Sequence, residues 1–124
     1  MATIKNFTSV EQSKKLAEIL PLESADMCYR AYREEGGILD YFATLCPYLL
    51  ASWVGIPCWS LTALLGVLPD ELEDNHFLTL SKEGAEYCCC YEDINGNSFR
   101  HTFADNPVDA CYEMIIRLNE LKVL

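Results

Sequence analysis

The side chains of this chain that are best suited to chemistry are two thiols and an imidazole. Cys88 and Cys90 lie on one strand-like segment, and His101 lies on the next. Asn95-Gly96 separates the two segments and favours a two-residue hairpin turn, because both residues tolerate positive φ. With this turn, Cys90 lies opposite His101, and Cys88 lies on the same face. The pattern therefore predicts that the three side chains are near one another.

This arrangement has three interpretations. As a nucleophile pair, His101 takes the proton of Cys90 and Glu92 orients the imidazole. As a metal site, Cys88, Cys90 and His101 supply three ligands of the kind that zinc prefers. As a structural feature, the thiols fill core volume and His101 lies at the sheet edge or bonds a carbonyl. The structural interpretation is favoured, because a hairpin face packed against helices is a poor cleft for a substrate.

The metal interpretation needs a fourth ligand, for which His76 and Cys111 are the candidates. The seven cysteines include no Cys-x-x-Cys spacing, which removes the usual zinc-knuckle and redox signatures. Three of them are adjacent and cannot all pair locally, and the start of the chain lacks the apolar run of a secretory signal. We therefore expect reduced thiols, a cytoplasmic location and no cofactor.

The predicted hairpin also indicates which face of the sheet is buried. One face would hold Cys88, Cys90, Glu92, Phe99, His101 and Phe103, and the other Tyr87, Cys89, Tyr91, Arg100 and Thr102. The first set is the more apolar of the two. We expect that first face to pack against the helices.

A second candidate site is of a different kind, because it consists only of carboxylates: Asp70, Glu71, Glu73 and Asp74. They begin a segment, 70–93, in which eight acids are opposed by Lys82 alone, within a chain of net charge -10. This balance opposes direct binding to nucleic acid, whose phosphates require a Lys/Arg patch, and adsorption to an anionic membrane. It permits docking on a basic partner protein, although most acidic surfaces serve only to keep a protein in solution.

Residues 41–69 have no charged side chain. A transmembrane helix needs about 20 uninterrupted apolar residues, whereas this stretch is divided by Pro47, Gly55, Pro57, Gly66 and Pro69. Acidic residues follow it at once, and no Lys or Arg follows before Lys82. We expect the stretch to be part of a buried core and the protein to have no membrane segment.

Three helices are indicated by their start signals. Ser9 and Gln12 have the spacing of a capping box at the start of a helix over 10–20. Ser60 is a natural N-cap for a short central helix that Gly66 or Pro69 ends. Asn106, followed by proline at the first helical position, begins a C-terminal helix with an apolar stripe.

Three strands are indicated over 76–81, 86–92 and 98–103, and the segments 27–32 and 38–50 are ambiguous. A chain of 124 residues is expected to form a single domain, 1–124. We predict an α+β fold in which a small antiparallel sheet of about three strands packs against the N-terminal, central and C-terminal helices.

Several motifs together resemble one group of proteins. They lie in segments 8–16, 24–27, 56–61 and 106–114, and include Asn-Pro-Val-Asp-Ala at 106–110. The most specific motif is Pro-x-Trp-Ser-Leu at 57–61. The chain resembles a family of small uncharacterised proteins of gut anaerobic bacteria and their prophages. The resemblance spans nearly the whole chain and implies a cytoplasmic protein associated with mobile elements. It implies no catalytic residue.

The chain has no phosphate-binding glycine loop and no serine nucleophile elbow. Together with small size, acidity and the resemblance, this favours a non-enzymatic accessory protein of phage or mobile-element origin that binds another protein. The alternative is a Cys/His metal-binding or thiol-dependent protein that uses the 86–103 hairpin. Metal analysis of the purified chain distinguishes the two.

Overall fold

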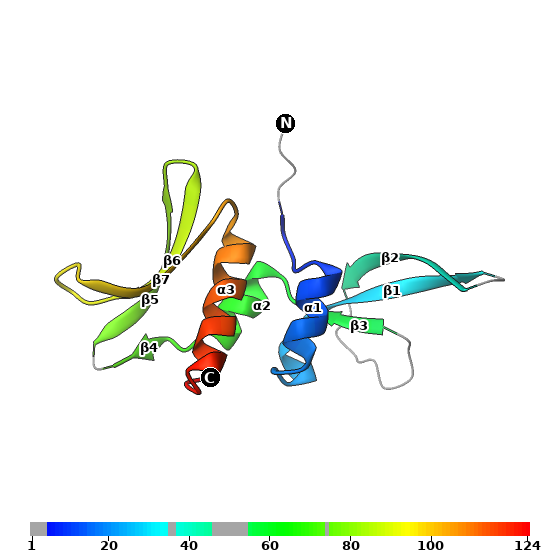
Figure 1. Ribbon diagram of the computed structural model, residues 1–124, viewed down its shortest axis with the longest axis horizontal. Helices are drawn as coiled ribbons and strands as arrows, with labels where there is room; N and C mark the ends of the chain where they lie inside the picture. Colours follow the sequence, from blue (N-terminus) through cyan, green and yellow to red (C-terminus); the bar gives the residue numbers. More distant parts are fainter. Residues whose placement is uncertain (1–4, 35–36, 46–54, 74) are drawn as a thin grey trace.

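The computed structural model describes residues 5–34, 37–45, 55–73 and 75–124, which form two antiparallel sheets with helices between them (Figure 1). One sheet has the order β2-β1-β3, from β1 (Met27–Glu34), β2 (Gly37–Leu45) and β3 (Gly55–Cys58). The other has the order β4-β5-β6-β7, from β4 (Glu71–Leu72), β5 (His76–Glu83), β6 (Glu86–Glu92) and β7 (Ser98–Ala104). The predicted α+β class is confirmed.

The three predicted helices are present as α1 (Val10–Ala17), α2 (Leu61–Val67) and α3 (Pro107–Glu120), with a short 3₁₀ turn, η1 (Leu22–Ser24), after the first. Ser9 and Gln12 form the capping box of α1, the Ser60 hydroxyl accepts the Ala63 N–H, and the Asn106 side chain accepts the Asp109 N–H. Each start was predicted from a local side-chain cap, and each prediction is confirmed.

The three-stranded sheet is the part of the fold that the sequence interpretation left open. Residues 27–32 and 38–50 had no decisive periodicity, and the first becomes part of β1. Its neighbour β3 is distant in the chain, since Met27 pairs with Cys58 and Arg30 with Gly55. Such pairing depends on tertiary contacts, which local patterns do not encode. The helices therefore lie between two sheets, where one sheet was expected.

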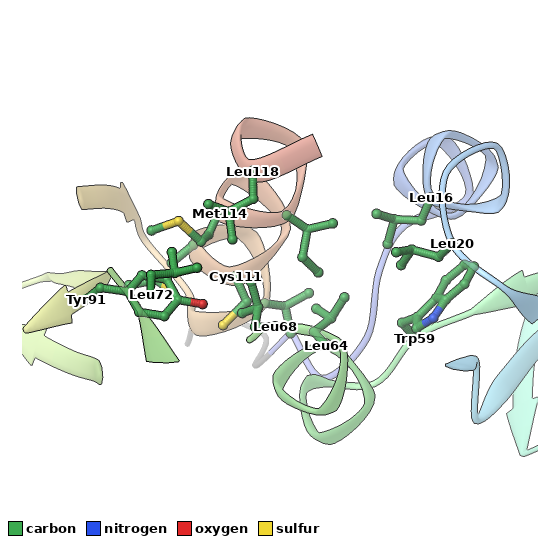
Figure 2. Packing of buried hydrophobic residues seen from close by; sticks show 14 residues of the cluster. Leu16, Leu20, Trp59, Leu64, Leu68, Leu72, Tyr91, Cys111, Met114 and Leu118 are labelled. Carbon is green, nitrogen blue, oxygen red and sulfur yellow. The ribbon is translucent and has the colours of Figure 1, made fainter. Parts of the chain in front are cut away.

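A continuous hydrophobic cluster fills the helical layer. Figure 2 shows Tyr91 and Leu72 at one end of it and Leu16, Leu20 and Trp59 at the other, with side chains of α2 and α3 between them. Other buried members are Leu64, Leu68, Cys89, Val108, Ala110, Cys111, Met114, Ile115 and Leu118. The apolar stripe predicted for the C-terminal helix therefore packs against both the sheet and α2.

The uncharged stretch contributes to this core where it is described. Trp59, Leu64 and Leu68 belong to the cluster, and Cys58 is also buried, while 46–54 lie outside the described residues. In the described part of the chain, no helix has the length and apolar content needed to cross a membrane.

The β6–β7 hairpin differs from the predicted two-residue turn. Asp93 organises a longer connection, because its carboxylate accepts the N–H groups of Asn95 and Asn97 at 2.9 Å. Pairing follows the predicted register from Tyr87 to Cys89, and then shifts by a bulge before Tyr91. Arg100 lies in the bulge with φ +55°. The predicted pairing of Cys90 with His101 is therefore wrong.

Candidate interaction surface

The four-stranded sheet has a buried inner face that is the opposite of the predicted one. Cys89 and Tyr91 are fully buried and belong to the core cluster. Thr102 is 5% exposed and donates a hydrogen bond of 2.7 Å to the Ala110 carbonyl of α3. This is the face that packs on α3, so the prediction that the face of Cys88 and Cys90 covers the helices is wrong.

The third strand explains the difference. Leu78 pairs with Tyr91 and Leu80 with Cys89, so β5 adds two leucines to the inner face. The prediction compared the two faces of β6 and β7 only, and on these two strands the face of Cys88 and Cys90 is the more apolar. The bulge also places Phe99 opposite Tyr91, with ring centroids 6.3 Å apart. Both changes move apolar area to the inner face.

The other face of this sheet is named here the outer face. By strand alternation and pairing it holds Glu71, Phe77, Thr79, Ser81, Glu83, Glu86, Cys88, Cys90, Glu92, Ser98, His101 and Phe103. Figure 1 shows the three helices to one side of this sheet. Phe77 is 50% exposed and Phe103 is 51% exposed, because none of the described elements packs over them.

Carboxylates lie beside Phe77 and at one end of the outer face. Phe77 pairs with Glu71 on one neighbouring strand and with Glu92 on the other. Glu83 and Glu86 face each other at the end of the β5–β6 hairpin, where both are exposed. Like charges placed opposite each other repel, so a cation bound at this end would relieve an unfavourable contact.

The predicted acidic residues lie at the β4 edge of the same sheet. Asp70, Glu71 and Glu73 are exposed, and Asp74 lies outside the described residues. Glu73 forms an ion pair of 3.3 Å with Arg100, and the Glu71 carboxylate accepts the Asn75 N–H at 2.9 Å. Of the predicted residues in the described ranges, only Glu71 belongs to the outer face.

The sequence interpretation did not assign Glu83 and Glu86 to any site. The available signal was the alternation of acids with small or apolar residues along two adjacent strands. This alternation can be interpreted only once the β5–β6 register is known, because that register places Glu83 opposite Glu86.

The thiols and the imidazole of the predicted chemical site lie on the outer face but do not form a catalytic pair. Cys88 and Cys90 are 2% and 4% exposed. His101 is exposed; its Nε2 atom hydrogen-bonds to Ser98 Oγ at 2.7 Å, and its ring stacks on Phe103 with centroids 5.9 Å apart. The imidazole of His101 therefore contacts side chains of its own strand, β7.

The proposed fourth ligands lie away from these thiols. Cys111 is in α3 and belongs to the same buried cluster as Cys89 of the inner face. His76 also belongs to the inner set by alternation, and its ring meets the Phe99 ring edge-on at 4.7 Å. Within the ranges that the structure describes, no three potential ligands are grouped as a metal site requires.

The protonation of the outer-face thiols is set by burial. Burial raises the pKa of Cys88, with a further increase from Glu83 and Glu92. Burial also raises the pKa of Cys90 to about 12, together with the neighbouring Cys88. Both groups are therefore neutral thiols at pH 7, whereas the thiolate is the nucleophile.

A polar groove runs beside β7, at the edge of the sheet that β6 does not occupy. It has a volume of about 550 Å³ and is lined by residues 101–104 of β7, by Gln12 of α1 and by Asp109, Glu113 and Arg117 of α3. Arg117 donates a hydrogen bond of 2.9 Å to the His101 carbonyl. The groove therefore places polar side chains along the backbone of an edge strand.

The two carboxylates that line this groove, Asp109 and Glu113, differ in whether they can bind a further cation. Lys5 Nζ lies 2.7 Å from the Asp109 carboxylate, and Gln12 donates to the same oxygen at 2.8 Å. Burial raises the pKa of Asp109, but the hydrogen bonds from Lys5, Gln12 and Asn106 outweigh it and hold that pKa below its usual value. Asp109 is thus already neutralised within the fold, while Glu113 is exposed.

Comparison of the chain with known protein families, with curated proteins and with solved structures finds no match.

Proposed function

We propose that this chain is a non-enzymatic accessory protein that binds a basic partner protein through the outer face of its four-stranded sheet, in the cytoplasmic, mobile-element setting that the family resemblance implies. One observation supports this above all others: Phe77 and Phe103 are half exposed on a face that also holds Glu71, Glu83, Glu86 and Glu92. Aromatic side chains with a polar rim are typical of the central part of protein interfaces.

The charge of the surface supports the choice of partner. The sheet segment 70–93 has eight acids and one lysine, so its potential is negative along β4, β5 and β6. A partner with Lys or Arg around an apolar centre is steered towards it and gains complementary contacts. An acidic partner would be repelled.

A displayed library of random peptides tests the proposal directly, because it offers the outer face every combination of charge and apolar character. We expect the selected peptides to be enriched in Lys and Arg around an apolar residue. Phe103→Ser, and the double variant Glu83→Lys with Glu86→Lys, should each weaken their binding by at least tenfold. The free energy of unfolding should change by only about 0.5 kcal/mol for the charge variants, since they are exposed.

Leu22→Ser is the matched control, because Leu22 is 48% exposed but lies in η1, away from the sheet. It should bind the selected peptides as the unaltered chain does. Selected peptides without basic enrichment, or equal losses in the control and in Phe103→Ser, would contradict the proposal.

The alternative is a thiol-dependent or metal-binding function at the same hairpin. It is favoured by one arrangement: Cys88 and Cys90 occupy alternate positions of β6 and so lie on the same face of the sheet. In that case purified protein would hold near-stoichiometric zinc or iron, and Cys90→Ser or His101→Ala would abolish activity. The binding function is preferred because both thiols are buried, at 2% and 4% exposed, and because no three potential ligands are grouped in the described ranges.

A further inference from the structure

We infer that the partner contributes an extended segment that pairs with the free edge of β7, in the groove between β7 and α3. This inference rests on the proposed function and names how the partner binds. In the described part of the chain β7 has β6 on one side and no strand on the other. An unpaired edge strand presents a row of backbone donors and acceptors that another chain can use.

The contact from α3 shows which backbone groups point to that edge. Arg117 reaches the His101 carbonyl from the helix side of the groove. Because alternate residues of a strand direct their N–H and C=O groups to the same side, Phe103 presents its backbone groups to this edge as well. An added strand would therefore find its hydrogen-bonding positions at His101 and Phe103.

The groove leaves space for a peptide beside this edge and is lined by polar side chains. Its volume of about 550 Å³ lies along residues 101–104, which is enough for a short stretch of peptide beside the strand. Glu113 is exposed within it, and Asp105 is exposed just after the end of β7. Both carboxylates favour Lys or Arg on the incoming segment.

The same charges argue against a second copy of this chain as the occupant. Each copy has a net charge of -10, and edge-to-edge pairing would bring the two acidic sheets together. A strand that extends this sheet also places alternate side chains on the outer face, beside Phe103 and near the glutamates of β6. A basic extended peptide avoids the repulsion between acidic sheets, and its side chains can contact Phe103 and the glutamates.

A synthetic peptide that alternates arginine and threonine over ten residues is the probe. Single N-methyl groups, moved along its backbone, remove one N–H donor at a time. We expect N-methylation to weaken binding at least tenfold at every second central position and to be tolerated at the positions between, because only alternate N–H groups face β7.

Arg117→Ala provides a second measurement, on the protein. It frees the His101 carbonyl for the incoming strand and removes a cation from the groove, so binding should strengthen by about three- to tenfold. Lys14→Ala is the control, because it removes one exposed cation from α1, outside the groove. It should change binding less than twofold.

Three results would overturn the edge-pairing inference: no binding of the peptide, equal tolerance of N-methyl groups at all positions, or a dimer in sedimentation that the peptide does not dissociate. Failure of the inference is separable from failure of the proposed function. If library peptides still depend on Phe103 and Glu86 while N-methyl groups are tolerated, the outer face binds through side chains alone.

Discussion

At the scale of single residues, Thr8 connects segments that are distant in the chain. Its Oγ1 atom accepts the Trp59 N–H at 3.2 Å and shares a hydrogen bond of 2.7 Å with Ser13 Oγ, and the side chain is fully buried. Its backbone carbonyl accepts the Tyr29 hydroxyl at 2.6 Å. These bonds tie the start of α1 to β1 and to the residues before α2.

We expect Thr8→Val to lower the free energy of unfolding by about 1–3 kcal/mol, because two buried groups lose their partner while shape is kept. Urea denaturation followed by circular dichroism measures the change. Thr8→Ser keeps the hydroxyl and should lose only about 0.8 kcal/mol for the missing methyl group. A valine variant more stable than the serine variant would contradict this role.

At the scale of elements, Asp109 joins α1 to α3. Its carboxylate accepts from Lys5 and Gln12, and Asn106 Nδ2 donates to it at 2.8 Å. Its pKa is lowered in the fold, so the stabilisation is complete above the ordinary value near 4 and is lost as the pH falls through the folded value.

We therefore expect Asp109→Asn to cost about 1–2 kcal/mol at pH 7 and progressively less below about pH 4. Urea unfolding at a series of pH values measures this difference. Asp105→Asn is the control, because Asp105 is exposed. If the cost of Asp109→Asn stays constant down to pH 2, the Asp109 side chain stabilises the contact between α1 and α3 through its shape and not through its charge.

The elements also show what the sequence could and could not predict. Helix starts at Ser9, Ser60 and Asn106, and the three strands around the hairpin, follow from neighbours within a few residues, so they were predictable. The β1–β3 pairing depends on residues distant in the chain. The longer connection after β6 depends on the hydrogen bonds that the Asp93 carboxylate accepts from Asn95 and Asn97. Glu71 was among the predicted interaction residues, whereas Phe103 was assigned to the buried face because the comparison of the two faces left out β5.

At the scale of the whole molecule, the helical layer joins the two sheets. Met114 and Leu118 of α3 belong to the same buried cluster as Leu16 of α1 and Trp59, which follows β3. Figure 2 shows the side chains of this cluster from Tyr91 at one end to Trp59 at the other. Loss of packing at one sheet should therefore weaken the other.

Met114→Ala tests this coupling, because Met114 is fully buried on the sheet side of the layer. The cavity should cost about 2–5 kcal/mol, a large share of a typical stability of about 5–15 kcal/mol. If the layer couples both sheets, tryptophan fluorescence and far-ultraviolet circular dichroism will report one coincident transition, shifted to lower urea in the variant. If the dichroism shifts while the fluorescence midpoint stays in place, the two sheets unfold independently. Glu120→Ala, at an exposed position of the same helix, should leave both midpoints nearly unchanged and so separates a packing effect from a general effect on α3.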